Sequence, residues 1–511
     1  MQLLHCNKCG GHAIVLWLSS APFERIRIPM RYPLPASFPM PCSRLPAAPL
    51  RLRPSFASCL AAVLLAGGLA LPWAAQAQES AGAGQDAAAD VAGDVVADVE
   101  SPFAIHGQTT YIWQRKPSFS APYTGDNSLT PDRAKSYSFT ATLDLGLRLW
   151  QGAEFHFNPE VAQGVPFSGL HGLGGPSNGE LAKTASPNPT FYRARAFIRQ
   201  TWGLGGGEEK LDADFNQFAR TVDKQRVVLT AGNYSVLDVF DQNPYGSDPR
   251  TQFMNWSFLT HGSFDYAADA RGYDWGVTLE YVGDEWSVRF GRFLQPLESN
   301  GQELDTRMFE HYGDVLEFEK RYRIAGRPGQ ARLLLWRNKA KMGAFNDAIA
   351  FGQANGVTPD VGDVRREHAK VGVGLAFLQE VNDSLGVFLR ANWSDDKTET
   401  YSFTEIGRQV AAGGTLKGTA WGRPKDEVGL GLAVNMLGPD HRNYLAAGGL
   451  GAFLGDGALN YGPEQVIELY YSFAVWKTLS LSPDFQFLRN PGYNRDRGPA
   501  RFFGIRAHAE F

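Results

Sequence analysis

The last eleven residues, RFFGIRAHAEF at Arg501–Phe511, decide between the possible folds of this chain. Successive side chains of a β-strand point to opposite faces, and this stretch has one apolar and one charged face. The apolar face carries Phe503, Ile505, Ala507, Ala509 and Phe511, and the other carries Arg506, His508 and Glu510. Terminal residues fray unless something holds them. The stretch therefore predicts either the closing strand of an outer-membrane β-barrel, apolar toward lipid and charged toward a wet lumen, or the last strand of a soluble β-sandwich.

The amino-terminal region has the three parts of a secretory signal peptide, which favours the barrel. A basic segment is followed by an apolar run and by small residues that a signal peptidase reads. These parts are Arg44, Arg51 and Arg53, then residues 57–73, then Ala75-Gln76-Ala77. The run is too short to be a membrane-spanning helix. Export across the inner membrane is what an outer-membrane protein requires.

The export signal divides the chain into four predicted segments. Cleavage is expected near Ala77, and Met40 is a plausible true start. All four cysteines precede the cleavage site, so neither a disulfide nor a zinc site is expected, and no cofactor is implied. The segments are an extension upstream of the true start at 1–39, the signal peptide at 40–77, a flexible periplasmic lead-in at 78–103 and the barrel at 104–511.

The composition argues against several classes of function. The formal net charge is −4 and charges of both signs are mixed, so no nucleic-acid partner is expected. No segment after the signal region approaches eighteen consecutive apolar residues, the minimum for a spanning helix. There is no G-x-S-x-G motif, and no histidine has an evident nucleophile beside it, so an outer-membrane hydrolase is not expected. The lead-in is too short and polar for the plug of an energised transporter.

Residues 104–511 break into segments of about ten alternating residues, the length that a tilted membrane strand requires. We predict an all-β fold, a transmembrane antiparallel β-barrel of sixteen strands. The predicted strands are 104–114, 136–150, 153–163, 190–202, 225–233, 270–282, 285–293, 313–325, 329–338, 366–379, 383–393, 400–410, 426–437, 463–475, 478–488 and 501–511.

The connections between these strands alternate in length. Links after the second, sixth, eighth, tenth and fourteenth strands are short, whereas those after the third, fifth, seventh, ninth and thirteenth reach about twenty residues or more. Links four and twelve are longer than expected for turns, and link eleven is short for a loop. Bacterial barrels keep short turns on the periplasmic side and long loops outside. Both termini are therefore expected in the periplasm.

The polar faces of three predicted strands supply the candidate pore-lining residues. Charges of both signs occur there, and such a wall suits neutral polyhydroxylated solutes, whereas a ring of one sign selects ions. The alternative is that the charges pair with one another and only stabilise a wet interior. The candidates are Glu154, Glu160, Arg193, Arg195, Arg199, Glu317, Glu319, Arg321 and Arg323.

Two long external links are candidates for a constriction. A sixteen-stranded tube would be wide unless something folds into it, and long loops are usually functional. The link at 234–269 is the longest, and the link at 164–189 is the second candidate. Both could instead cap the barrel from outside. In the longer link the candidate residues are Asp238, Asp241, Arg250 and Trp256, a mixture of charged and aromatic side chains that could bind hydroxyls and sugar C–H faces.

Several short motifs, taken together, carry a family resemblance. They are GQTTY (107–111), WQRKPSF (113–119), NPEVAQG (158–164), GLHGLGG (169–175), NPTFYRAR (188–195), RQTWG (199–203) and AGNYS (231–235). The set resembles the carbohydrate-selective porins of the OprB type over essentially the whole exported chain. The resemblance implies a sixteen-stranded outer-membrane porin that passes monosaccharides such as glucose by passive diffusion. It also implies a pore narrowed by inward loops and by charged lumen residues.

We therefore expect a non-enzymatic porin of the bacterial outer membrane that is selective for small neutral sugars. The alternative is a general or anion-leaning porin of the same fold, in which Arg193, Arg195 and Arg199 favour anions because the facing glutamates are paired. Expected partners are outer-membrane lipid and lipopolysaccharide, together with the assembly machinery, which would read Phe511. A homotrimer is expected from the architecture in general and not from any residue.

Overall fold

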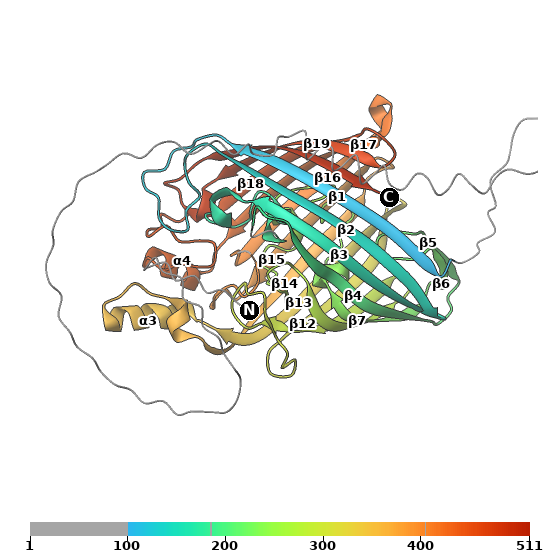
Figure 1. Ribbon diagram of the computed structural model, residues 1–511, viewed down its shortest axis with the longest axis horizontal. Coiled ribbons are helices and arrows are strands. Elements are labelled where there is room, and N and C mark those ends of the chain that lie inside the picture. Colours follow the sequence, from blue (N-terminus) through green and yellow to red (C-terminus); the bar gives the residue numbers. More distant parts are fainter. Residues whose placement is uncertain (1–100, 184–185, 404) are drawn as a thin grey trace, which may run out of the picture. The chain divides into compact units, whose positions relative to one another are not determined.

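Sixteen antiparallel strands form one closed barrel in the computed structural model, which describes residues 101–183, 186–403 and 405–511 (Figure 1). The barrel strands are β1 (Phe103–Lys116), β2 (Ala134–Trp150), β3 (Ala153–Val165), β4 (Thr190–Gly203), β7 (Arg226–Tyr234), β8 (Asp274–Val282), β9 (Trp286–Phe293), β12 (Tyr312–Ile324), β13 (Arg327–Met342), β14 (Arg366–Glu380), β15 (Leu385–Ser394), β16 (Arg408–Gly418), β17 (Arg423–Met436), β18 (Glu464–Ala474), β19 (Leu479–Arg489) and β20 (Ala500–Glu510). The predicted sixteen-stranded barrel is confirmed.

The final strand closes the barrel by pairing with the first. The register runs from Gln108 opposite Glu510 to Arg115 opposite Phe503. Phe511 extends the seam, because its backbone N–H and C=O pair with those of Gly107 at 3.0 Å each. Closure therefore leaves no free edge in the barrel sheet that could pair with another chain.

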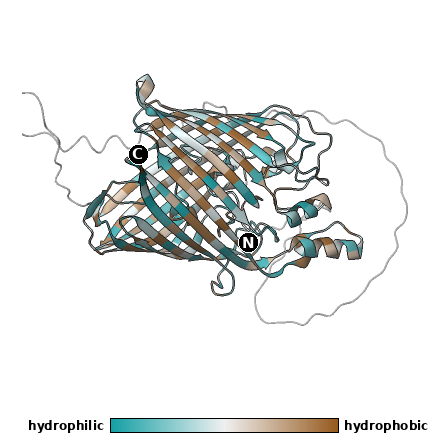
Figure 2. Ribbon diagram, turned by 180° about the vertical axis from the view of Figure 1, so that it is seen from behind, coloured by the Kyte–Doolittle hydropathy of each residue, from teal (hydrophilic) through white to brown (hydrophobic). Residues whose placement is uncertain are grey.

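The two faces of the wall differ as the alternating pattern predicts. Apolar side chains are exposed on the outside, for example Leu279, Phe377 and Leu432, while polar ones are buried on the inside, such as Thr278 and Gln486. Apolar and polar residues alternate along the strands in Figure 2. The usual arrangement of a water-soluble protein is inverted, as expected for a barrel with lipid outside and a polar lumen.

The twelfth strand is the one misplaced by the sequence pattern. It was expected at 400–410, but β16 spans Arg408–Gly418. Tyr401 and Phe403 alternate like strand residues, yet they belong to a link and are both buried. The real strand contains Ala411 to Gly414, whose small side chains obscure the alternation. With β16 in place, link twelve becomes a short turn and link eleven a loop, so two of the three exceptions to the length rule disappear and link four remains.

The two ends of the barrel differ. Counted in order around the barrel, every second strand is followed by a link of four residues or fewer. The exception is the β4–β7 link, which contains β5 (Glu208–Leu211) and β6 (Arg220–Asp223). The opposite end carries the long loops and most of the remaining elements. These are β10 (Gln295–Pro296), β11 (Leu304–Asp305), α2 (Trp256–Leu259), α3 (Phe345–Asn355), α4 (Pro439–Ala446), and the 3₁₀ turns η1 (Phe167–Leu170), η2 (Gly179–Lys183), η3 (Val236–Asp238), η4 (Val361–Val364) and η6 (Pro491–Tyr493). The turn η5 (Thr419–Trp421) lies at the other end, between β16 and β17.

Within the described ranges, none of the helices is both long and apolar enough to cross a membrane. The predicted upstream extension, signal peptide and nearly all of the lead-in fall on residues 1–100, which lie outside the described residues.

Candidate functional site

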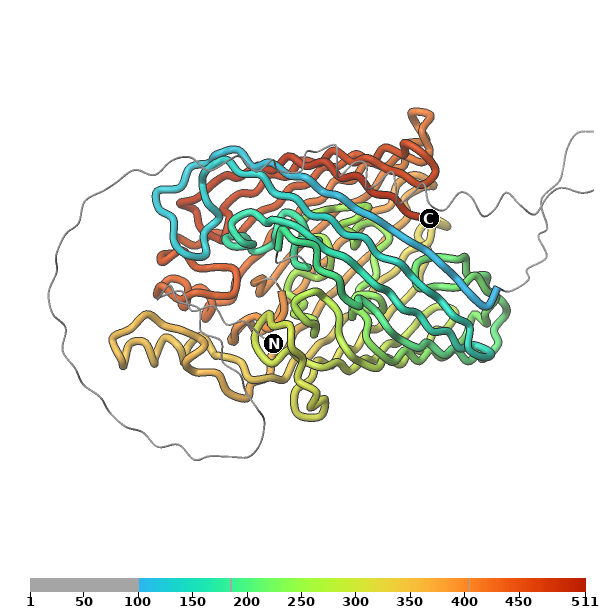
Figure 3. The backbone as a smooth tube through the Cα atoms, in the orientation of Figure 1, coloured from blue at the N-terminus to red at the C-terminus, as the bar shows by residue number. Residues whose placement is uncertain are grey.

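The β7–β8 link, residues 235–273, folds into the lumen and does not cap the barrel from outside. In Figure 3 its green trace lies within the outline of the barrel. Its middle reaches the far wall, where the backbone N–H groups of Met254 and Asn255 donate to the Glu468 carboxylate of β18 at 2.5 and 3.0 Å. The Asn255 side chain donates to Gln486 of β19 at 3.0 Å and also caps α2. The expectation of an inward-folded loop is confirmed.

Two fully buried arginines of the wall hold the backbone of this loop. Arg506 of β20 donates to the carbonyls of Pro249, Thr251 and Gln252 at 3.0, 2.6 and 2.5 Å. Arg390 of β15 donates to the Phe258 carbonyl at 2.8 Å. Backbone carbonyls buried without a donor are costly, so these arginines make the inward path of the loop possible.

The second candidate loop, the β3–β4 link, also folds inward and meets the first. Its Gly174 and Gly175 N–H groups donate to Glu464 of β18 at 3.1 and 3.2 Å. The Pro176 carbonyl accepts from the Trp256 N–H of the β7–β8 link at 3.0 Å. Both loops start from the same end of the barrel, and together they narrow the lumen.

A cavity of about 220 Å³ lies where the two loops face β4. This volume is below the 300–1,000 Å³ usual for drug-sized ligands, so the cavity suits one small solute. Its wall combines charged and aromatic side chains. The charged ones are Glu180, Lys183, Arg195, Asp238, Asp248, Arg250 and Arg271, and the aromatic ones are Trp256, Tyr266, Tyr273 and Phe403.

Arg250 joins the two loops to the wall through a pair of carboxylates. Its guanidinium lies 2.9 Å from Glu160 of β3 and 2.8 Å from Glu180 of η2. Lys183 lies 3.5 Å from Glu180. Burial would raise the pKa of the Glu180 carboxyl, but Arg250 and Lys183 outweigh burial and lower it. The Glu180 carboxylate therefore stays ionised and paired with Arg250 and Lys183.

Arg195 and Asp238 form the second ion pair at the cavity. The guanidinium of Arg195 meets both Asp238 oxygens, at 2.7 Å through Nε and 2.6 Å through Nη2. It also lies 5.1 Å from the centre of the Tyr273 ring. A guanidinium held flat by a carboxylate keeps further N–H donors available to a solute hydroxyl.

Trp256 supplies an aromatic surface opposite the charged groups. Its ring lies nearly parallel to Tyr266, at 9° with centroids 6.3 Å apart, and 5.0 Å from Phe403. Phe403 comes from the β15–β16 link, the segment that was expected to be a strand. Phe403 therefore faces this cluster, while Tyr401 packs separately against Ala340 and Met342, and neither faces lipid.

The other predicted residues lie away from this cavity. Asp241 is buried and accepts from Thr260 at 2.8 Å, with Arg390 at 3.2 Å, so it shapes the loop. Arg199 binds Glu154 at 2.8 Å near the short-turn end.

The predicted residues of β12 also lie elsewhere and are paired. Glu317 and Glu319 share Arg289 of β9 at 2.8 and 2.9 Å. Arg321 donates to Glu319 and to the Gly283 carbonyl, while Arg323 donates to the Gly326 carbonyl. The two arginines thus support short turns at the rim. For Glu317, Glu319 and Arg321, the alternative that the charges pair with one another describes what is observed.

Arg193 was expected in the lumen, and that placement is wrong. The β3–β4 register shifts between Asn158 and Pro159, which leaves Ala194 unmatched in the ladder. Such a bulge reverses the faces on either side of it. Tyr192 consequently points inward and donates to Glu160, whereas Arg193 is exposed and lies 5.0 Å from the ring of the outward-facing Trp275.

The residues that sequence reasoning missed are those that anchor the inward loops. Four of them carried a usable signal, since each is a charged residue on the polar face of an otherwise apolar-alternating strand; the fifth, Glu180, lies in the η2 turn of a loop. No pattern in the sequence shows which of these faces a loop. The missed residues are Lys370, Arg390, Glu464 and Glu468, together with Arg250's partner Glu180.

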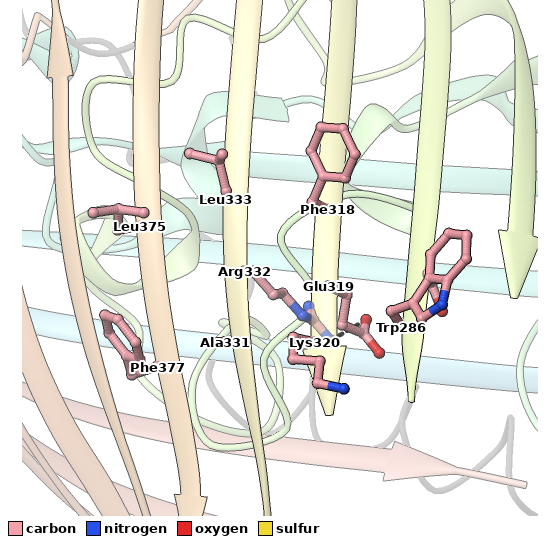
Figure 4. A pocket seen from close by; sticks show the side chains of 10 residues that line it. Trp286, Phe318, Glu319, Lys320, Ala331, Arg332, Leu333, Leu375 and Phe377 are labelled. Carbon is pink, nitrogen blue, oxygen red and sulfur yellow. Dashed lines mark ion pairs between the residues drawn. The ribbon is translucent and has the colours of Figure 1, made fainter. Parts of the chain in front are cut away.

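A larger hollow, of about 410 Å³, lies in the wall at β9, β12, β13 and β14 (Figure 4). Phe318, Leu375 and Phe377 line it, and all three are among the exposed apolar side chains of the outer face. Their position identifies it as a groove toward lipid. It is not a site for a polar solute despite its greater size.

Comparisons with known proteins agree with this geometry. Residues 126–511 match the family model described as carbohydrate-selective porin, OprB family. Porin B of Pseudomonas aeruginosa is 23% identical over 443 residues, which cover 79% of this chain and 90% of that protein. The structure of Pseudomonas putida OprB at high pH has a TM-score of 0.62 and 18% identity, covering 80% of this chain and 94% of that one.

Proposed function

This chain belongs to the OprB family of carbohydrate-selective porins of the outer membrane, and from that premise we propose that it passes monosaccharides such as glucose by passive diffusion. The proposed selective site is the cavity between the two inward loops and β4. A channel protein needs no catalytic group there, only a passage that binds its solute weakly enough to release it.

The observation that carries this proposal is the composition and size of the cavity wall. Aromatic rings of Trp256, Tyr266 and Tyr273 offer flat apolar surfaces, and Arg195 and Glu180 offer donors and acceptors. A pyranose has the complementary surface, with C–H groups on its faces and hydroxyls around its edge. The small volume favours one sugar ring over a disaccharide.

The pairing of charges supports a neutral solute over an anionic one. Arg195 is bonded to Asp238, and Arg250 is bonded to both Glu160 and Glu180. A bare arginine cluster would attract anions, but paired groups leave little net field. The anion-leaning alternative depended in part on Arg193, which lies on the outer face.

Liposome swelling with a series of solutes tests the proposed selectivity. Proteoliposomes are diluted into isotonic glucose, into disaccharides and into amino acids matched in size to glucose. We expect glucose-sized sugars to enter faster than both other groups. Equal rates for all solutes of one size would leave only a general pore.

The export signal and the terminal aromatic residue belong to the same proposal. Cleavage near Ala77 predicts that the protein purified from outer membranes begins at Gln78, which amino-terminal sequencing checks. Deleting Phe511 should reduce the amount of folded protein in the outer membrane if the assembly machinery reads that residue. Normal assembly of the truncated chain would argue against that role. Lipopolysaccharide contact and a homotrimer remain expectations of the architecture.

A further inference from the structure

The β4–β7 link is an exception at its end of the barrel. It spans 204–225, while the other links at that end have four residues or fewer. β5 and β6 pair within it as a separate two-stranded sheet, and they lie at the end of the barrel opposite α3 and α4 (Figure 1). We call residues 204–225 the exit insert.

The tip of the exit insert bonds to side chains of the lumen wall. The Asn216 N–H donates to Asp144 of β2 at 2.8 Å, and the Asn216 carbonyl accepts from Arg199 of β4 at 2.8 Å. The Ala219 carbonyl accepts from Arg148 of β2 at 2.7 Å. Asp144 is completely buried on the inner face. The tip therefore lies inside the mouth of the barrel and not beyond it.

Phe218 of the exit insert packs into a space on the inner face of the barrel wall. Its ring lies 5.6 Å from the ring of His156 and 4.7 Å from the Arg148 guanidinium. A Cβ on Gly146 of β2 would come within 3.0 Å of the Phe218 ring, so glycine makes room for it. Phe218 is only 4% exposed although it stands in a link at a barrel end.

Arg220 completes the attachment on the other side of the tip. Its guanidinium lies 3.6 Å from Glu154 of β3 and donates to the Thr201 hydroxyl at 3.2 Å. At the base, Gln225 N–H donates to the Gly205 carbonyl at 3.0 Å. The insert is thus held at its base and tip, as the constriction loops are held at the other end.

We propose that the exit insert is a second constriction of this channel, at its periplasmic mouth. Solutes and ions that have passed the cavity leave the lumen past the tip at Asn216–Phe218. The lumen face that the tip covers is no longer open to water, so the passage is narrower there. The proposal needs the chain to be a channel but is independent of which solute is preferred at the cavity.

A cysteine at the tip tests whether it lines the path of ions. Residues 60–511 contain no cysteine, so a single introduced thiol can be addressed in the exported chain that begins near Gln78. Gln217→Cys is placed at the tip, and Lys210→Cys, on the exposed strand β5, is the matched control. Each protein is reconstituted in a planar bilayer and treated with a positively charged methanethiosulfonate reagent, and labelling is verified by mass.

The expected result is a stepwise fall of single-channel current for Gln217→Cys and no change for Lys210→Cys. Complete labelling at the tip with unchanged current would overturn the proposal. So would a tip thiol that stays unlabelled while the control reacts, because a residue lining a wet passage must be accessible. Sugar selectivity in liposomes is not the readout, so failure here is distinct from failure of the monosaccharide proposal.

A shortened variant measures the size of the effect. Residues 206–224 are replaced by Asn-Gly, so that Gly205 and Gln225 flank a two-residue turn. Two comparable constrictions in series predict that removing one raises conductance by about twofold. Unchanged conductance in a folded variant would contradict a narrowing role. Folding is verified by heat-dependent mobility, and the cysteine experiment decides the question if this variant does not assemble.

Discussion

Two parts of the lumen wall use charged residues in different ways. The cavity wall, with Glu160 and Arg195, binds charged side chains of the loops. The anchoring wall, with Arg390, Glu468 and Arg506, binds chiefly their backbone. The Arg195–Asp238 pair of the first remains partly exposed, whereas Glu160 and the three side chains of the second are fully buried. A charged residue on the polar face of a strand therefore contacts solute or secures a loop according to its partner.

The largest effect on transport is expected when Arg506, which anchors the β7–β8 loop, is replaced. In Arg506→Ala, the carbonyls of Pro249, Thr251 and Gln252 lose their donors, at a cost of about 1–3 kcal/mol each. The β7–β8 loop should leave the wall, which raises single-channel conductance and abolishes discrimination between mono- and disaccharides in liposome swelling. Arg501→Ala, an exposed position on the same strand, is the control. Wild-type discrimination in Arg506→Ala would show that the loop holds without this residue.

Replacing Arg195 in the cavity wall should slow transport, whereas replacing Arg506 should speed it. Arg195→Ala removes a donor from the cavity and should lower the glucose rate by about tenfold, the equivalent of one charge-assisted hydrogen bond. Heat stability should change far less, because the ion pair with Asp238 is partly solvated. Arg193→Ala, two residues away but on the outer face, should leave the rate unchanged. If stability falls and the rate does not, Arg195 is structural.

A smaller effect is expected at the aromatic surface. Trp256→Leu keeps an apolar side chain but removes the ring, and aromatic contacts are worth about 0.5–1.5 kcal/mol beyond burial. The glucose rate should therefore fall a few-fold, with less effect on amino acids of similar size. Trp393→Leu, at an outward-facing Trp, is the control. A parallel loss for sugars and amino acids would indicate a change in loop packing instead.

The smallest effect on transport is expected at a titratable anchor outside the barrel. His441 of α4 is buried, which disfavours its charged form, but Asp396 at 3.2 Å and Glu405 at 3.6 Å outweigh burial and raise the pKa of His441 to about 9. A raised pKa means that the stabilisation is complete below pH 6.5 and is lost as pH rises through 9.

Hydrogen exchange of residues 437–463 should therefore be slower at pH 6 than at pH 10, after correction for the intrinsic pH dependence. His441→Gln should remove the difference, and the glucose rate should be nearly the same in both proteins. Persistence of the difference in the variant would assign it to another group.

Sequence reasoning located fifteen of the strands within a few residues, because each must alternate apolar and polar side chains and span a fixed thickness. It failed at 400–410, where Tyr401 and Phe403 have the same alternation but are buried in a link, Phe403 against Trp256 and Tyr401 against Ala340 and Met342. It also failed at Arg193, because the unmatched residue Ala194 changes which face of β4 the preceding side chains occupy. Nothing in the amino-acid pattern marks that position as a bulge. The alternation of apolar and polar residues predicts local backbone geometry, but it does not show which distant residues a side chain contacts.

The terminal segment Arg501–Phe511 separates what the sequence determined from what the tertiary structure decided. Its pattern alone determined a two-faced strand that ends the sheet, because side-chain alternation is a property of the backbone. That Phe511 pairs with Gly107, and that Arg506 holds three carbonyls of a loop some 250 residues earlier, was decided only by the closed barrel. These contacts join residues far apart in the chain, and only the tertiary structure brings them together.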